Sequence, residues 1–392
     1  MSLTNLPMIP AEAFPARWEA VRQLMAHHDL DLFVAWADDR AVFGPAHARW
    51  LANVPIHFEP ACVVMPRFGH PLLLTGPETV AYALCVGQIK DVRAASLFVH
   101  PDEDYPYATI HPLAGILAEV TGGRPLRRIG LAGKGLMNAE AWEAWHEAVP
   151  GAEWVDMENR LCDLRAIKSP EEIAVIRYAY RIAQAGLDAA VNAIAVGITE
   201  REVAAEAEAA MRRMGAEGTG IDTIVASGPN ARPILARSTF REIQDNELVL
   251  LTIAPRYEGY HAAIGRPVFV GTPKVETLRA FEVACHAQEA CYAALRPGIE
   301  GRTVEAVGRR IVGDAGLGQH FLYSGVHSLG VIEFEPPIFG PSSDALILKD
   351  MTLSIDIPLF DAPWGGLRVE DGYLITDAGA EKLHDTPFRI NR

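Results

Sequence analysis

The chain has 392 residues, enough for two domains, and its 49% hydrophobic and 22% charged residues are typical of a folded globular protein. A formal net charge of −15 argues against binding to nucleic acid or to an anionic membrane. No apolar run approaches the roughly 20 residues of a membrane-spanning helix, and no secretion signal pattern is visible. Five dispersed cysteines without a Cys-x-x-Cys pair indicate reduced thiols, so we expect a cytoplasmic protein.

Short apolar runs alternate with helical patterns in the first part of the chain. Strand-like runs are DLFVAWA (31–37), ACVVMP (61–66) and HPLLLTG (70–76), and helical spacing marks residues 16–28 and 77–87. This alternation predicts a smaller α/β domain, which we place at residues 1–160.

Two helix starts follow the boundary. Ser169 precedes Pro170 and stands three residues before Glu172, and Thr199 has the same spacing to Glu202. Each is a capping box, in which two side chains satisfy amide groups that the first helical turn leaves unpaired. The sequence therefore predicts a pair of helices that opens a second domain at residues 161–392.

The rest of this second domain mixes strands and helices. The expected strands are 247–254, 260–271, 331–337, 351–358 and 366–375, and the expected helices are 275–295 and one around 304–316. A helix pair, a hairpin, a second helix pair and then strands predict an α+β sheet backed by helices.

Several stretches of the chain resemble the pita-bread family of creatinase, prolidase and methionine aminopeptidase. They occur in family order: LRAIKSPEEIAVIR, SGPNA (227–231), YEGYHAAIGRPVFVG (257–271), HSLGV, EPP and RVEDGYLIT (368–376). HARWLANV in the first part resembles the smaller N-terminal domain of prolidase and creatinase. The resemblance implies an α+β protein, with a pita-bread catalytic domain after a creatinase-type α/β domain.

The resemblance also implies a pocket that has lost metal ligands. Metal-dependent members hold two divalent ions with two aspartates, a histidine and two glutamates. The aspartate positions correspond to Thr252 and Ala263, whereas His327, Asp356 and Glu370 correspond to the histidine and the glutamates. These three ligands carry too little negative charge for two dications, so we expect no metal cofactor. A single divalent ion such as Mn²⁺ at the same three residues is the alternative.

HSLGV and LTIAPRYEGY resemble creatinase, a metal-free member of the family. The residues that act on creatine in that enzyme correspond to Leu235 and Gly265, so creatine is not the expected substrate. We predict a homodimeric, metal-independent hydrolase that cleaves an amide or amidine C–N bond. Its substrate would be a small polar or amino-acid-derived molecule.

Four residues are the candidate catalytic groups: His327, His261, Asp356 and Glu370. A histidine with a pKa of about 6.5 can carry a proton near neutral pH. The two carboxylates could bind the positive end of a substrate or position a water molecule. For each residue, hydrogen bonding that only stabilises the fold is the structural alternative.

Further residues are candidates for substrate contact: Arg49, Trp50, His57 and Phe58 in the first domain, and Thr252, Arg266 and Glu335 in the second. An arginine with aromatic rings can hold a carboxylate and cover a methylated or cyclic group. In creatinase-like dimers the first domain reaches the partner's site, which makes these residues candidates. Ordinary packing or a salt bridge is the alternative for each. Glu333 alternates with Glu335 along one expected strand, and we expect it to be solvated.

Three other functions are consistent with the same residues. One is an Xaa-Pro dipeptidase or aminopeptidase-type metallohydrolase with a degraded metal site. Another is a non-catalytic binding or scaffold protein of the same fold. The third is a lyase that abstracts a proton from a sulfonium or similar substrate.

Overall fold

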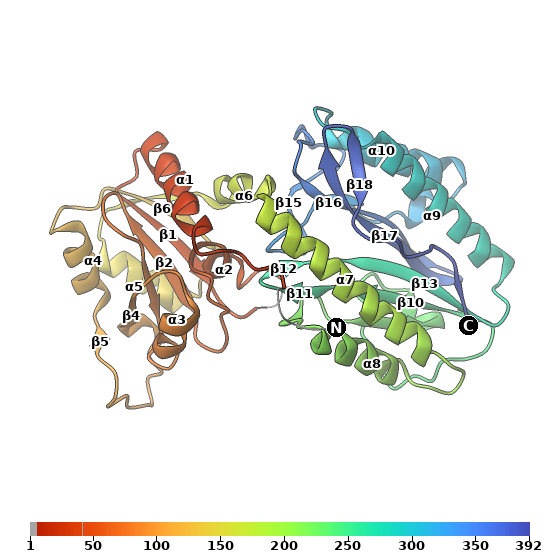
Figure 1. Cartoon of the computed structure of the whole chain (residues 1–392), viewed down its shortest axis with the longest axis horizontal. Coiled ribbons are helices and arrows are strands. Elements are labelled where there is room, and N and C mark those ends of the chain that lie inside the picture. Colours follow the sequence, from red (N-terminus) through yellow and green to blue (C-terminus); the bar gives the residue numbers. More distant parts are fainter. Residues whose placement is uncertain (1–5, 41) are drawn as a thin grey trace. The chain divides into compact units, whose positions relative to one another are not determined.

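The computed structural model describes residues 6–40 and 42–392, which form two compact units (Figure 1). The N-terminal unit is Pro10–Leu164, and the C-terminal unit is Arg165–Arg392 together with the described residues up to Ile9. The contacts of the chain thus divide after Leu164, whereas a domain boundary at residue 160 remains a prediction.

A seven-stranded mixed sheet forms the N-terminal unit, in the order β5-β4-β3-β2-β1-β6-β7. Its strands are β1 Leu32–Ala37, β2 Ala61–Pro66, β3 Leu72–Thr75, β4 Asp91–Ala95, β5 Ile110–His111, β6 Arg128–Ala132 and β7 Glu153–Asp156. Its helices are α1 Ala13–His27, α2 Ala46–Ala52, α3 Val80–Val86, α4 Leu113–Thr121 and α5 Ala139–Ala148, with α6 Glu158–Ala166 at its end. The central strands β1 and β2 are apolar and buried at every position, because both faces of the sheet are covered.

The C-terminal unit contains a nine-stranded sheet, with the order β15-β14-β16-β17-β13-β10-β9 along its main path. Its strands are β9 Ile224–Ser227, β10 Glu247–Ile253, β13 Ile264–Val270, β14 Val326–Ser328, β15 Glu335–Ile338, β16 Thr352–Ala362, β17 Gly365–Thr376, β18 Gly379–Lys382 and β19 Ile390–Asn391. A small sheet consists of β8 Gly218–Thr219, β11 Pro255–Tyr257 and β12 Tyr260–His261. The described sheet order agrees with the α+β domain expected from the sequence.

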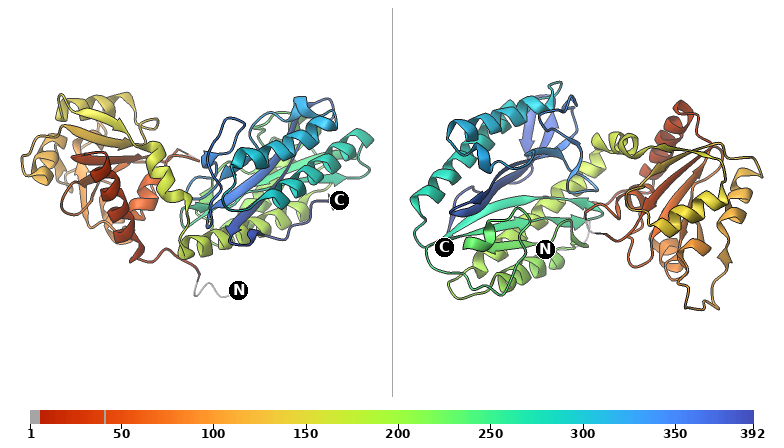
Figure 2. Two further views of the ribbon diagram at one scale, coloured as in Figure 1. Left: turned by 90° about the horizontal axis from the view of Figure 1, so that it is seen from above. Right: turned by 180° about the vertical axis from the view of Figure 1, so that it is seen from behind.

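Two helix pairs pack on these sheets (Figure 2): α7 Pro170–Ala193 with α8 Glu200–Arg213, and α9 Val275–Ala294 with α10 Gly301–Asp314. Helix α9 contacts β16 and β17, whereas α7 contacts β11 and β12. Both capping boxes are present as predicted, at Ser169 with Glu172 and at Thr199 with Glu202.

The cysteines and the helices bear on two expectations drawn from the composition. All five cysteines are free thiols, as expected for reduced cysteines. Within residues 6–40 and 42–392, none of the helices combines the length and apolar character that membrane crossing requires.

Candidate metal centre

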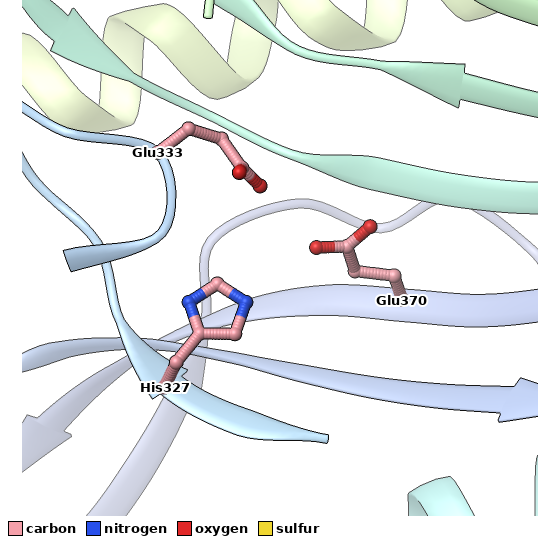
Figure 3. A group of neighbouring side chains, drawn as sticks. All are labelled: His327, Glu333 and Glu370. Atoms are coloured by element: carbon pink, nitrogen blue, oxygen red, sulfur yellow. The ribbon is translucent and has the colours of Figure 1, made fainter. Parts of the chain in front are cut away.

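Strands β14, β16 and β17 bring the ionisable groups of the C-terminal unit together. Strand β16 pairs with β14 on one side and β17 on the other, and the register places Asp356 opposite Glu370. Glu333 enters from the bend that precedes β15. The ligand atoms of His327, Glu333 and Glu370 all lie within 4.8 Å of one another, and Figure 3 shows their side chains pointing toward one space.

His327 is oriented by its own backbone neighbour. Its Nδ1 lies 2.9 Å from the carbonyl oxygen of Ser328, which assigns the proton to Nδ1 and leaves the Nε2 lone pair available. The ring of Phe334 packs against the imidazole, with 4.5 Å between ring centroids. Burial lowers the pKa of His327, so the imidazole is neutral, which is the form that binds a metal ion.

Glu370 has one oxygen held and one oxygen free. Its Oε1 accepts a hydrogen bond of 2.8 Å from the Ser354 hydroxyl, and its buried Oε2 has no partner among the described residues. Arg266 fixes the backbone at this point by donating from Nη1 to the Glu370 carbonyl oxygen over 2.8 Å. An unpartnered carboxylate oxygen is costly in a buried place, so Oε2 is suited to receive an ion or a proton.

Glu333 is the residue for which the sequence interpretation was wrong. It is only 6% exposed rather than solvated, because β15 begins at Glu335 and the bend before it turns Glu333 inward. Burial, and then the charge of Glu370, raise its pKa to about 8. A cation between these two carboxylates would relieve that repulsion.

Asp356 is part of a different set of contacts. Its Oδ2 accepts a hydrogen bond from the Tyr323 hydroxyl, and Arg368 Nε lies 3.5 Å from the same oxygen. Arg368 also donates from Nη2 to the Tyr323 hydroxyl oxygen over 2.6 Å. Burial raises the pKa of Asp356 to about 6, although the Arg368 charge opposes that rise. Its Oδ1 has no partner among the described residues.

His261 and Thr252 lie in neighbouring parts of the same unit. His261, in β12, has its Nδ1 3.1 Å from the Gly330 carbonyl oxygen. Burial, and then the charge of Arg256, lower its pKa to about 3, so this imidazole is uncharged at neutral pH. Thr252, in β10, accepts a hydrogen bond of 3.4 Å from Arg368 Nη1 and so contacts the cluster through that arginine.

Glu335 and Arg266 have their charges matched by other residues. Glu335 pairs with Arg165, with 2.8 Å between Oε1 and Nε, and both side chains are buried. Arg266 forms a buried ion pair with Asp371. Both residues therefore hold the walls of the site in place, and direct contact with a substrate remains a prediction for them.

The candidates from the first domain all lie in the N-terminal unit. Arg49 and Trp50 are buried in α2, and the carbonyl oxygen of Trp50 accepts a hydrogen bond of 2.8 Å from Arg17. His57 and Phe58 follow in an exposed loop, where Phe58 is 72% exposed. Their role in substrate binding remains a prediction.

Sequence reasoning missed Arg368 and Tyr323, and it misplaced Glu333. Arg368 could have been found, because it stands two residues before Glu370 on one strand and so faces the same side. Tyr323 lies in a loop before β14, and no local pattern marks it.

Comparison with known proteins decides the family. Metallopeptidase family M24 matches residues 174–377, more than half of the chain. The chain belongs to metallopeptidase family M24. An Xaa-Pro dipeptidase from Pyrococcus furiosus is 30% identical over 253 residues, covering 64% of this chain and 73% of that protein. The uncharacterised peptidase YqhT from Bacillus subtilis is 29% identical over 265 residues, covering 68% and 75%.

Solved structures of M24-like fold resemble the whole chain. The prolidase from Pyrococcus furiosus has a TM-score of 0.77 at 22% identity, covering 93% of this chain and 99% of that one. The X-Pro aminopeptidase from Thermotoga maritima has a TM-score of 0.80 at 21% identity, covering 95% and 99%. These matches confirm the expected pita-bread fold with its preceding N-terminal domain.

Membership of M24 confirms one functional expectation and overturns another. The chain is a hydrolase that acts on C–N bonds, as the resemblance implied. The expectation of no metal cofactor is wrong, because M24 is a metallopeptidase family and the structure contains a candidate metal-binding group. The physical reason is Glu333, whose carboxylate was not counted among the ligands.

The donors of this group fit a divalent ion. A neutral imidazole with a free Nε2 and two carboxylates form a donor set that Mn²⁺, Co²⁺ or Zn²⁺ accepts. The unpartnered Oε2 of Glu370 supplies one ligand atom at no loss of an existing hydrogen bond.

Proposed function

We propose that the chain is a metal-dependent peptide-bond hydrolase of the Xaa-Pro dipeptidase type, with its divalent ion at His327, Glu333 and Glu370. The observation that carries this proposal is the buried group of three donors within 4.8 Å. The names of the relatives from Pyrococcus furiosus and Pyrococcus horikoshii, both Xaa-Pro dipeptidases, support the substrate class. This proposal replaces the metal-independent hydrolase of an amide or amidine C–N bond that the sequence led us to expect.

Each side chain has a role that its contacts support. A bound divalent ion lowers the pKa of a coordinated water and polarises a carbonyl group. The Ser328 carbonyl keeps the His327 proton on Nδ1, and the Ser354 hydroxyl orients Glu370. Asp356 Oδ1 has no hydrogen-bond partner among the described residues, so this carboxylate can take a proton from the attacking water and deliver it to the departing amine nitrogen.

The test is hydrolysis of dipeptides by the purified chain. We expect cleavage of dipeptides with proline in second place, such as Met-Pro, and slower cleavage of Met-Ala. An excess of chelator should abolish activity, and Mn²⁺ or Co²⁺ should restore it. His327→Ala should be inactive with and without added metal. Full activity in chelator would contradict the proposal.

We also propose that the chain is a cytoplasmic homodimer. Its five free thiols support the location, because oxidising compartments favour disulfides. Light scattering coupled to size-exclusion chromatography tests the dimer, which should have twice the mass of the 42.7 kDa chain.

A further inference from the structure

The buried cluster holds one more carboxylate than the three-residue group uses. Asp356 stands opposite Glu370 across β16 and β17, yet it is outside the set of ligand atoms that lie within 4.8 Å of one another. Its Oδ2 is already engaged by the hydroxyl of Tyr323 and by the guanidinium of Arg368. Asp356 therefore has a cationic partner that the protein itself supplies.

Arg368 is fixed in this position by its surroundings. Its Nη1 and Nη2 reach Thr252 Oγ1 and the Tyr323 hydroxyl oxygen, over 3.4 Å and 2.6 Å. The guanidinium carbon lies 5.4 Å from the ring centroid of Phe360, within cation–π range. Gly265 leaves the space for it, since a Cβ there would lie 2.7 Å from the Cγ and Cδ of Arg368.

The charges of the cluster then limit what it can take up. Three carboxylates, on Asp356, Glu333 and Glu370, face one guanidinium, which stays charged because arginine does not lose its proton in proteins. Fully ionised, these four groups leave two negative charges. One divalent ion neutralises them, whereas a second would leave a buried positive excess with no counter-charge among the described side chains of the cluster.

From this arrangement we infer that the chain binds a single divalent ion rather than a pair. Glu333 is a ligand of that ion, and Asp356 stays paired with Arg368 outside its coordination. The inference rests on the proposed function, because it takes the ion to enter this cluster. It goes further by fixing the number of ions and by choosing between two buried carboxylates.

The first measurement is stoichiometry. Apo-protein titrated with Mn²⁺ in a calorimeter should bind one ion per chain, and elemental analysis after dialysis should give the same ratio. Electron paramagnetic resonance of the Mn²⁺-loaded protein should show the six-line spectrum of an isolated ion. Two ions per chain, or the many-line spectrum of a coupled pair, would overturn the inference.

The second measurement separates the two carboxylates. Glu333→Gln should weaken Mn²⁺ binding by about 100-fold or more, since it removes a ligand. Asp356→Asn/Arg368→Met removes the ion pair while keeping the net charge, so it should bind Mn²⁺ with nearly the wild-type affinity. Tyr323→Phe is a milder version of the same control. Equal losses in Glu333→Gln and Tyr323→Phe, with folding verified by circular dichroism, would contradict the ligand assignment.

These outcomes distinguish the inference from the proposed function. A chain that needs metal for activity but binds two ions would refute the inference alone. A chain that binds no Mn²⁺ and keeps its activity in chelator would refute the proposed function as well.

Discussion

The buried carboxylates of Glu333 and Asp371 show that the charge of a neighbouring side chain decides whether a buried acid is ionised. Burial raises the pKa of Glu333 to about 8, with another carboxylate close by. For Asp371, burial also acts to raise the pKa, but the charges of Arg266 and His384 outweigh it and hold the pKa well below its ordinary range. Asp371 is therefore ionised and stabilising, whereas Glu333 is held ready to exchange its proton for a cation.

The ion pair of Asp371 predicts a large effect on stability. Asp371→Asn should lower the free energy of unfolding by about 3–5 kcal/mol, because it leaves the buried guanidinium of Arg266 without its counter-charge. Denaturant unfolding measures this change. The matched control is Asp377→Asn, which breaks a largely exposed pair with Lys349 and should have little effect on stability, because water and salt screen such a pair. A similar small loss in both variants would contradict the role given to Asp371.

The same residue predicts a pH dependence. The folded pKa of Asp371 lies below the 3.8 of an ordinary aspartate, so its contribution is fully present above that pH. It is lost as pH falls toward the folded value. The difference in unfolding free energy between the wild type and Asp371→Asn should therefore shrink below a pH of about 4. A difference that stays constant down to acid unfolding would argue against this account.

Gly265 predicts a steric effect beside the metal group. In Gly265→Ala the new Cβ would lie 2.7 Å from Arg368 carbons and 2.9 Å from the Glu370 Cβ, so both side chains must shift. We expect a loss of about 1–3 kcal/mol in unfolding free energy, together with weaker Mn²⁺ binding. Gly135→Ala is the control, since nothing lies within 4 Å of its Cβ position. Unchanged Mn²⁺ affinity in Gly265→Ala would show that Arg368 and Glu370 tolerate the intrusion.

At the scale of helices and strands, the sequence correctly predicted features that depend on nearby residues. It did not predict the bend before β15 that turns Glu333 toward the interior. The capping boxes of α7 and α8 follow from residues three apart, so the sequence alone predicts them. Strand-like runs such as 31–37 and 61–66 follow from composition. The inward turn of Glu333 depends on a bend between two strands, and no spacing rule encodes it.

The two capping boxes differ in a way that can be measured. Glu172 of α7 is buried and also accepts a hydrogen bond of 2.5 Å from the Tyr260 hydroxyl, whereas Glu202 of α8 is exposed. Glu202→Ala should cause only a small loss of stability, because this side chain is exposed to water. Glu172→Ala should cost clearly more, since it also leaves the buried Tyr260 hydroxyl without this acceptor. Thermal unfolding of both variants provides the comparison, and equal losses would contradict it.

For the molecule as a whole, the sequence predicted the two parts and the family but not the chemistry of the centre. Motif order along the chain carries the fold, because many positions contribute to it. The metal group depends on one residue, Glu333, which the resemblance does not include. Counting which family metal ligands are missing cannot reveal a carboxylate, such as that of Glu333, at a position where the family has no ligand.

Metal binding should therefore appear in the stability of the molecule. An ion that binds only the folded C-terminal unit adds about 2.7 kcal/mol at a concentration of 100 times its Kd. Calorimetry should show a higher unfolding temperature with Mn²⁺ for the wild type and a much smaller increase for Glu333→Gln. Chelator should reverse the shift. An equal increase in both proteins would point to ions bound elsewhere.

Strand β17 carries Glu370 and Asp371 side by side, one facing the metal group and the other facing Arg266 on the opposite side of the sheet. A slip of one residue against β16 would exchange them, because neighbouring side chains of a strand point in opposite directions. The pairing error would place two unmatched charges in the interior at once. Because Glu370 and Asp371 need different partners, the correct register of β16 and β17 is favoured over a register shifted by one residue.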